Sequence, residues 1–372
     1  MNNQHTSSQR PPASEDLNSF TSGTSTPEEL RVFRNFRRIY TRAAGDGREA
    51  RLFGLSTLSK AEAALRKYAL DASDEAFYFE FPLSGEARMD LLLQYNCGKI
   101  RLPITQGTDG SLSLPSEFAS FFESCAKDPQ IASYLVGFSF DLSKGRDAPG
   151  IYLLPPRDQP NIDYVPDMLD RLKASSRLQK VMEAFGSVPA GWQPYYVGCM
   201  DSRPDSPTRL GFFLDQVMSR RYREDKPLLK KDLTRCCRWP VPENMLNQIH
   251  LLFQKGYVWD IQLDMFPDGD FARALGVSVR DDADKNAWNT TESFLTSNLM
   301  PELMLILESW GLADERWRLV REACSAVRRN VLEGIRIKTV ADLVSISTCK
   351  VRFKNDEAVL AKDYLFARSC DL

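Results

Sequence analysis

The stretch GFSFDLSKGRDAPGIYLLPP, residues 137–156, is the part of the chain that best indicates its fold. Its two ends, residues 137–142 and 151–154, are rich in apolar and aromatic side chains, and the intervening SKGRD is polar. Two short apolar segments around a polar, glycine-containing turn predict an antiparallel β-hairpin.

The hairpin pattern recurs along the chain. Four further hairpins are predicted from residues 77–83 with 87–95, 195–201 with 209–215, 260–266 with 274–281, and 343–353 with 358–366. The segments before each hairpin carry apolar residues at three- and four-residue spacing, which predicts pairs of helices. One of these predicted helices covers residues 313–331, ADERWRLVREACSAVRRNV. The chain is therefore expected to repeat a helix-helix-strand-strand unit five times.

Ten antiparallel strands need a way to protect the two edges of their sheet. Closing the sheet into a barrel removes both edges, and a barrel of this size encloses a ligand cavity. The predicted fold class is thus α+β, a ten-stranded antiparallel β-barrel surrounded by α-helices, in a single domain over residues 28–372. Two α+β half-domains with separate open sheets are the alternative. Residues 1–27 are rich in Ser, Thr, Asn and Pro, which predicts a disordered tail.

Composition excludes several classes of partner. The chain has 372 residues, 43% of them hydrophobic and 26% charged, and a net charge of −2. This balance is typical of a soluble globular protein and lacks the basic field of nucleic-acid or membrane-surface binding. No apolar run approaches the roughly 20 residues that span a bilayer. We expect neither a nucleic-acid nor a membrane partner.

Cysteine and histidine usage argues against a structural metal site. Eight cysteines are present with only two histidines, and no cysteines are spaced as CxxC. A Cys/His zinc site is therefore not expected, and reduced thiols favour a cytoplasmic protein. The sequence also contains no GxSxG, GxxxxGK[ST] or GxGxxG motif. Their absence argues against the common classes of hydrolase, nucleotide-binding protein and dehydrogenase.

The order of elements, together with two hairpins, resembles a known superfamily. FYFEFPL followed by ARMDLLLQY, and FDLS followed by APGIYLLPP, are similar to the first two hairpins of the aromatic prenyltransferases, the ABBA or PT-barrel fold. The resemblance extends to fungal indole prenyltransferases and to cyanobactin-type peptide prenyltransferases. It implies that Glu80 is the general base and that Arg88 binds diphosphate.

The resemblance is incomplete at the residues that bind the diphosphate in the superfamily. In the superfamily, the second strand of a hairpin usually carries an inward basic-x-Tyr pattern, which Lys362 and Tyr364 follow. The other hairpins depart from it, with Gly150 and Tyr152 on the second, Arg209, Gly211 and Phe213 on the third, and Val277 and Val279 on the fourth. The diphosphate site is therefore expected to carry fewer of these basic and tyrosine residues than is usual in the superfamily.

Strand alternation gives a direct reason to consider Glu80. In FYFEFPL, three phenylalanines share one face, while Tyr78 and Glu80 share the other. We expect the phenylalanines to pack under the helices and Glu80 to face the cavity. A lone carboxylate in an apolar cavity should have a raised pKa, which suits a general base. The alternatives are an exposed Glu80 and one paired with Arg88.

Two further groups of residues are candidates for substrate binding. A cationic group predicted to bind the diphosphate comprises Arg88, Arg209, Lys350, Arg352 and Lys362. An aromatic group predicted to shield an allylic cation or line the acceptor pocket comprises Tyr152, Tyr196, Phe213, Trp259 and Tyr364. The alternatives are a solvated charged strand face for the first group and ordinary packing for the second.

The predicted function is transfer of an allylic prenyl group from a prenyl diphosphate to an aromatic or peptide acceptor, as in natural-product (secondary) metabolism. The alternatives are a barrel that binds a peptide or small molecule, and a barrel with other chemistry such as ester hydrolysis. No tightly bound cofactor is expected. The resemblance leaves Mg²⁺ open, because the peptide branch uses it and the fungal branch generally does not.

Overall fold

The strands predicted from the hairpin pattern form one closed barrel. The computed structural model describes residues 27–371 except 69, 71, 73–74, 101–115, 146–147, 157–161, 201–202, 204, 283–290 and 334–335. The barrel strands are β1 (Glu75–Pro82), β2 (Asp90–Asn96), β3 (Leu135–Phe140), β4 (Gly150–Leu154), β5 (Trp192–Cys199), β6 (Thr208–Leu214), β7 (Tyr257–Met265), β8 (Phe271–Arg280), β10 (Arg336–Lys354) and β11 (Glu357–Asp371). Each predicted hairpin corresponds to a pair of these strands.

The barrel is closed by its last two strands. β1 to β8 pair in chain order, β8 pairs with β10, β10 with β11, and β11 returns to pair with β1. All these pairings are antiparallel. Each of the ten strands therefore has a neighbour on both sides, and closure leaves none of them as a free edge. The predicted fold class is confirmed, and the alternative of two open sheets is wrong.

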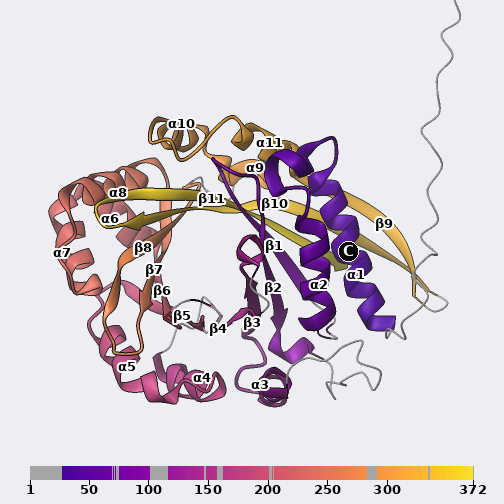
Figure 1. Cartoon of the computed structure of the whole chain (residues 1–372), viewed down its shortest axis with the longest axis horizontal. Helices are drawn as coiled ribbons and strands as arrows, with labels where there is room; N and C mark the ends of the chain where they lie inside the picture. Colours follow the sequence, from indigo (N-terminus) through magenta and orange to yellow (C-terminus); the bar gives the residue numbers. More distant parts are fainter. Residues whose placement is uncertain are drawn as a thin grey trace, which may run out of the picture.

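Helices surround the barrel on its outer face (Figure 1). They are α1 (Pro27–Ala44), α2 (Thr57–Tyr68), α3 (Ser116–Lys127), α4 (Val165–Arg171), α5 (Leu178–Gly186), α6 (Gln216–Glu224), α7 (Lys226–Cys237), α8 (Glu243–Lys255), α9 (Thr291–Thr296), α10 (Pro301–Ser309) and α11 (Arg316–Ala323). Since a strand exposes alternate side chains on opposite faces, one set packs under these helices and the other set points inward.

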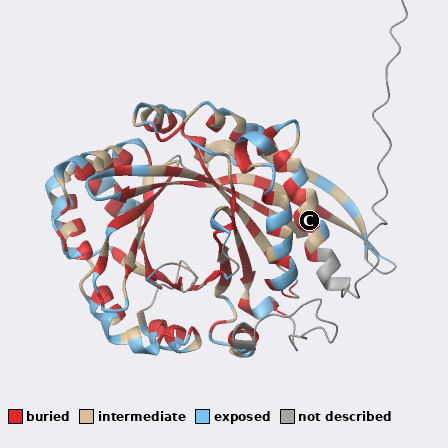
Figure 2. Cartoon of the chain, viewed as in Figure 1, coloured by how far each residue is buried: buried red, intermediate tan, exposed pale blue. Residues whose placement is uncertain are grey.

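The main hydrophobic core lies between the helices and the outer face of the barrel, where buried positions alternate along the strands (Figure 2). On β1, Phe77, Phe79 and Phe81 are fully buried, as the alternation predicts. Phe36 of α1 contacts the rings of Phe77 and Phe79, and Phe53 contacts those of Phe79 and Phe81. Burial of each such ring contributes about 1.5–3 kcal/mol, which holds α1 and the following turn against the barrel.

The helix predicted over residues 313–331 is wrong in its second half. α11 ends at Ala323, and β9 (Ser325–Glu333) follows it. β9 pairs antiparallel with the first half of β10, from Val344↔Ser325 to Arg336↔Glu333. The long β10 extends past the barrel, and its free backbone groups pair with this segment instead of leaving it helical. β9 therefore adds an eleventh strand beside the ten that close.

Three sequence predictions concern the ends of the chain and its surroundings. The predicted tail, residues 1–27, lies outside the described residues except for Pro27, where α1 begins. All eight cysteines are free thiols. Among the residues described, no helix combines the length and the apolar character needed to cross a bilayer.

Candidate functional site

The inward-facing side chains enclose two adjoining chambers. The aromatic chamber has a volume of about 450 Å³, and its aromatic lining residues are Tyr78, Tyr152, Tyr195, Tyr196, Trp259 and Tyr364. The charged chamber has a volume of about 490 Å³ and is lined by nine Lys or Arg and four Asp or Glu residues. Glu80, Arg209 and Lys350 line both chambers and form their common boundary.

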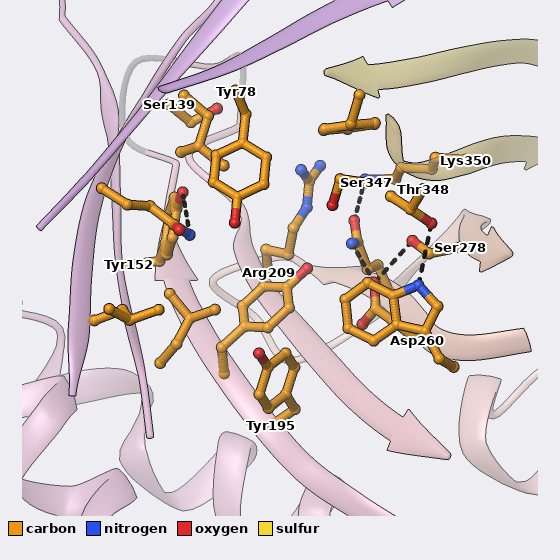
Figure 3. Close-up of a pocket in the computed structure, with 18 of the residues that line it drawn as sticks. Tyr78, Ser139, Tyr152, Tyr195, Arg209, Asp260, Ser278, Ser347, Thr348 and Lys350 are labelled. Carbon is orange, nitrogen blue, oxygen red and sulfur yellow. Dashed lines mark hydrogen bonds between the residues drawn. The ribbon is translucent and has the colours of Figure 1, made fainter. Parts of the chain in front are cut away.

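Three β-bulges shape the aromatic chamber. Each inserts one unpaired residue into its strand: Tyr195 in β5, Trp259 in β7 and Ser347 in β10. A bulge breaks the two-residue alternation and can aim consecutive side chains at the same side. Each bulged residue and the residue after it, Tyr196, Asp260 and Thr348 respectively, line the aromatic chamber. Tyr195, Asp260, Ser347 and Thr348 are labelled in Figure 3.

The aromatic wall is a second hydrophobic cluster, separate from the main core. The rings of Tyr152 and Tyr196 lie 6.2 Å apart between centroids, and those of Tyr195 and Trp259 lie 6.1 Å apart. The indole N–H of Trp259 donates to Oγ1 of Thr348 at 3.1 Å. The polar edge of this ring is therefore satisfied, and its apolar body is left for the chamber.

Gly211 on β6 lies directly against an aromatic ring. A Cβ atom on Gly211 would lie 2.2 Å from Cε1 of Tyr196, inside van der Waals contact. The ring of Tyr196 thus fills the space above this backbone position. A side chain at position 211 would displace this ring, which accounts for the glycine there.

Gly211→Ala is expected to lower the free energy of unfolding by about 1–3 kcal/mol, because the added methyl group must displace the Tyr196 ring. Urea denaturation of the purified protein measures this change. Gly186→Ala is the control, since nothing lies within 4 Å of a Cβ at Gly186. Equal effects of the two substitutions would contradict the packing role of Gly211.

Glu80 faces the cavity as predicted, but it is not a lone carboxylate. Lys362 donates to Oε1 of Glu80 at 2.7 Å and to Oδ2 of Asp90 at 3.0 Å. Burial alone would raise the pKa of Glu80, but the charges of Lys362 and Lys350 lower it to about 2. The expected raised pKa is therefore wrong, because an ammonium group from the distant strand β11 offsets the burial. Neither alternative is what the structure shows, since the side chain of Glu80 is less than one-fifth exposed and its partner is Lys362 rather than Arg88.

Lys350 lies between the two chambers, where nearby carboxylates only partly offset the effect of burial on its charge. Burial lowers its pKa to about 7, and the charge of Arg209 acts in the same direction, while Glu80 and Asp260 oppose it. Its amine donates to Oε1 of Gln262. Lys350 is therefore partly charged near neutral pH and can gain or lose a proton as ligands arrive.

Three arginines of the charged chamber are held in fixed positions by carboxylates. Arg209 donates to both oxygens of Asp264, at 2.8 and 3.1 Å, and Arg352 shares Oδ2 of Asp264 at 3.2 Å. Arg203 binds Asp141 in the same two-pronged way, at 3.0 and 2.8 Å. Burial would raise the pKa of Asp264, but its arginine partners hold it below its ordinary value.

Three further cations of the charged chamber are less constrained. Arg88, Arg273 and Lys354 form no ion pair with the residues that the structure describes. Arg273 and Lys354 are exposed, and Arg88 is half-buried. These side chains are available to an anion entering the chamber.

The predicted site residues largely gather as two groups. The predicted diphosphate residues, Arg88, Arg209, Lys350, Arg352 and Lys362, all line the charged chamber. Four of the predicted aromatic residues, Tyr152, Tyr196, Trp259 and Tyr364, line the aromatic chamber. Phe213 is a correction: it lines neither chamber, and its ring packs 6.1 Å from that of Tyr195, the bulged residue that takes the place on the chamber wall.

Sequence reasoning also missed residues on β7 and β8. Val277 and Val279 of the fourth hairpin are fully buried on the outer face, and Ser278 and Arg280 line the aromatic chamber instead. The pattern DIQLD, residues 260–264, carries the signal for β7, because its alternate polar residues are those that face inward. Asp260 and Gln262 line the aromatic chamber, and Asp264 lines the charged chamber.

The carboxylates of the charged chamber do not fit a protein-held metal. Those of Glu80, Asp90, Asp141 and Asp264 each bind a Lys or Arg side chain. No group of three or more His, Cys, Asp or Glu suited to a metal ion occurs within the described part of the chain. We therefore derive no step through a protein-bound Mg²⁺.

Comparisons with known proteins give a remote likeness. No family model matches the chain, and no curated protein matches it. Among solved structures, the chain is similar to a 6-dimethylallyl tryptophan synthase, with 12% sequence identity and a TM-score of 0.46. The match covers 92% of this chain and 96% of that one. The barrel of the present protein is defined by its own strand pairings, independently of this likeness.

Proposed function

We propose that the protein transfers an allylic prenyl group from a prenyl diphosphate to an aromatic acceptor. The observation that supports this most directly is the boundary where Glu80, Arg209 and Lys350 line both chambers. A prenyl diphosphate has an anionic end and an apolar end joined at one carbon. The two chambers offer matching surroundings for the two ends, with the reacting carbon at the boundary.

The charged chamber suits the leaving group. In the proposed reaction the allylic C–O bond breaks and the diphosphate departs with the bonding electron pair. The excess of nine cationic over four acidic residues favours this developing negative charge. Arg and Lys donors, held in place by their carboxylate partners, need little rearrangement to receive phosphate oxygens.

The aromatic chamber suits the allylic cation and its acceptor. Each ring face stabilises a nearby cation by about 0.5–2 kcal/mol. The buried wall formed by Tyr152, Tyr195, Tyr196 and Trp259 also keeps water from capturing the cation. The π electrons of the acceptor then form the new C–C bond, or a heteroatom lone pair forms a C–N or C–O bond.

Glu80 is the proposed base. Its carboxylate takes the proton that the aromatic substrate loses when the new bond forms. The lowered pKa makes it a weak base, but the protonated intermediate of an aromatic substitution is a strong acid. A carboxylate that stays ionised near neutral pH is sufficient to take this proton. When Lys362 shifts toward a bound diphosphate, the pKa of Glu80 rises and the carboxylate becomes a better base.

A specific observation favours the alternative of a binding barrel or other chemistry. Several cations of the charged chamber are already paired: Arg203 with Asp141, Arg209 with Asp264, and Lys362 with Glu80 and Asp90. These internal pairs compete with an incoming anion. A protein that holds a neutral small molecule in the aromatic chamber would not need unpaired cations in the charged chamber.

Ligand-dependent stability distinguishes the two functions. Dimethylallyl or geranyl diphosphate at a hundred times its dissociation constant should raise the free energy of unfolding by roughly 2.7 kcal/mol. Urea denaturation with each ligand, with and without Mg²⁺, measures this effect. Geraniol, which lacks the diphosphate, should stabilise the protein much less. Equal stabilisation by geraniol would support the binding barrel, and no stabilisation by either diphosphate would refute prenyl transfer.

A matched pair of variants tests the role of the chamber boundary. Lys350→Met should weaken geranyl diphosphate binding about tenfold, because it removes one charge-assisted contact. Lys255→Met is the control, since Lys255 forms an exposed pair with Glu302 on the outer helices. An unchanged dissociation constant in Lys350→Met would place the diphosphate elsewhere.

A further inference from the structure

One carboxylate of the aromatic chamber has an unused oxygen. Asp260 is 1% exposed and lines the chamber. Its Oδ2 accepts hydrogen bonds from Nε2 of Gln262 at 2.5 Å and from Oγ of Ser278 at 3.0 Å. Its Oδ1 has no hydrogen-bond partner among the residues described. The arrangement is drawn in Figure 3.

The position of this oxygen is fixed by its surroundings. Lys350 donates to Oε1 of Gln262, so the amide of Gln262 must present its N–H₂ group to Asp260. Ser278 holds the same Oδ2 from the neighbouring strand β8. With both donors on Oδ2, the carboxylate cannot turn to satisfy Oδ1 without losing one of them. The bulge at Trp259 places this fixed group on the chamber wall.

A buried carboxylate oxygen without a donor destabilises the folded protein, because it has lost its hydrogen bonds to water. Most buried polar atoms in folded proteins have a partner. Asp260 lines a cavity of about 450 Å³, and a ligand bound there can supply the missing donor. Glu80, the other carboxylate on this chamber, is already paired with Lys362.

The surroundings favour a neutral donor over a cation. Lys350, Arg209 and Arg280 also line the aromatic chamber, and they would repel an ammonium or guanidinium group there. The guanidinium of Arg280 already lies 4.1 Å from the ring centre of Trp259. A flat aromatic ring bearing one polar hydrogen combines the apolar surface and the single donor that the wall requires.

We propose that Oδ1 of Asp260 accepts a hydrogen bond from a ring N–H or phenolic O–H of the aromatic acceptor and fixes its orientation. Asp260 is an acceptor-binding residue in this proposal, and the proton released on bond formation goes to Glu80. Naming the ligand as the acceptor rests on the proposed function. The predicted preference of Asp260 for an aromatic hydrogen-bond donor does not rest on the proposed function.

Two isomeric probes test the hydrogen bond without a change in ligand size. 3-Methylindole keeps the ring N–H, whereas 1-methylindole replaces it with a methyl group. Isothermal titration calorimetry should show the wild-type protein binding 3-methylindole at least about tenfold more tightly, because the wrong isomer leaves Oδ1 unpaired. A second pair, 1-naphthol and 1-methylnaphthalene, shows whether a phenolic O–H serves as well as a ring N–H.

Asp260→Asn should abolish the preference. Gln262 and Ser278 both donate to the Oδ2 position, so the amide oxygen of Asn should occupy it. The amide N–H₂ group then takes the place of Oδ1 and presents a donor where an acceptor is needed. The two methylindoles should bind within about twofold of each other. Asp356→Asn, in the exposed turn between β10 and β11, is the matched carboxylate control and should retain the tenfold preference.

Several results would overturn the proposal. These are equal binding of both isomers to the wild-type protein, an unchanged preference in Asp260→Asn, or no binding of any of the four probes. If Asp260→Asn does not fold, Asp260→Ala serves as the second variant, and the wild-type comparison stands by itself. Stabilisation by geranyl diphosphate is measured separately. Its absence with an intact methylindole preference would refute only prenyl transfer.

Discussion

Replacing Lys362 by methionine is expected to lower the free energy of unfolding by about 3–5 kcal/mol, because it leaves buried carboxylates without their cation. The ammonium of Lys362 binds both Glu80 and Asp90, and all three side chains are less than one-fifth exposed. Asp90 keeps two donors from Ser143, at 3.1 and 2.9 Å, so Glu80 suffers the larger loss. Urea denaturation at pH 7 measures the effect.

The deficit of Lys362→Met should depend on pH. The folded-state pKa of Glu80, about 2, lies below its ordinary value of 4.5. The stability from this pair is therefore fully present above pH 4.5 and is lost as pH falls toward 2. The difference between wild type and Lys362→Met should shrink over the same interval.

Two variants control for the loss of a lysine. Lys354→Met removes an exposed lysine that has no ion pair with the described residues, and its effect should stay within about 0.5 kcal/mol. Glu80→Gln combined with Lys362→Met should be more stable than Lys362→Met alone, because the unpaired charge is gone. If the double variant were as unstable as the single one, the ion pair would not be the cause.

Asp363→Asn is expected to have the opposite effect and to stabilise the protein at pH 8. Asp363 is fully buried on the outer face of β11, opposite Cys349 of β10. Neither of its oxygens has a nitrogen or oxygen partner among the described residues. Burial raises the pKa of Asp363 from 3.8 to about 7, and a hydrogen bond from the Cys349 thiol opposes this only weakly.

The sign and size follow from the two pKa values. Between pH 3.8 and about 7, the folded protein keeps a proton that the unfolded chain has lost. Stability therefore falls as pH rises through this interval, by about 1.4 kcal/mol for each pH unit, and levels off above it. The free energy of unfolding of Asp363→Asn relative to wild type should thus increase by about 4 kcal/mol from pH 4 to pH 8.

Unfolding curves of both proteins at several pH values provide the measurement, and Asp356→Asn serves as the control. Asp356 is exposed in the turn between β10 and β11, so its substitution should leave the pH dependence of wild type unchanged. A constant difference between Asp363→Asn and wild type from pH 4 to pH 8 would show that the Asp363 carboxyl group does not titrate in this way.

These two predictions concern adjacent residues of one strand. Side chains alternate along β11, so Lys362 points into the charged chamber and Asp363 points into the core beneath the helices. Loss of contact with water disfavours both charges, but the partners of Lys362 offset that cost, whereas Asp363 has no charged partner to do so. Replacing Lys362 alone measures the effect of the paired charge, and replacing Asp363 alone measures the effect of the charge without a partner.

Much of the barrel could be predicted from local pattern. The five hairpins, their turns and the helices between them are encoded in short segments with period-two and helical spacing. Alternation placed Glu80 on an inward face, and the resemblance placed Lys362 and Tyr364 there, as the structure has them. β9 was missed because its strand conformation depends on pairing with β10 rather than on its own composition.

The bulged positions could not be predicted in this way. A bulge shifts the alternation by one residue, and no local signal in the sequence marked those at Tyr195, Trp259 and Ser347. The aromatic wall was therefore assigned incompletely, and Asp260 was overlooked as a chamber residue. The inward register of β8, with Ser278 in place of Val277, likewise emerged only with its strand partners.

The sequence by itself determined the ten barrel strands and most of the surrounding helices, because these depend on spacing along the chain, and it singled out five of the cations that line the chambers. Only the tertiary structure decided which charges meet. Glu80 and Lys362 lie 282 residues apart in sequence, yet they share a hydrogen bond because β11 closes the barrel against β1. The protonation of Glu80, Lys350 and Asp363 depends on such distant neighbours and on burial, and neither is present in any short stretch of the chain.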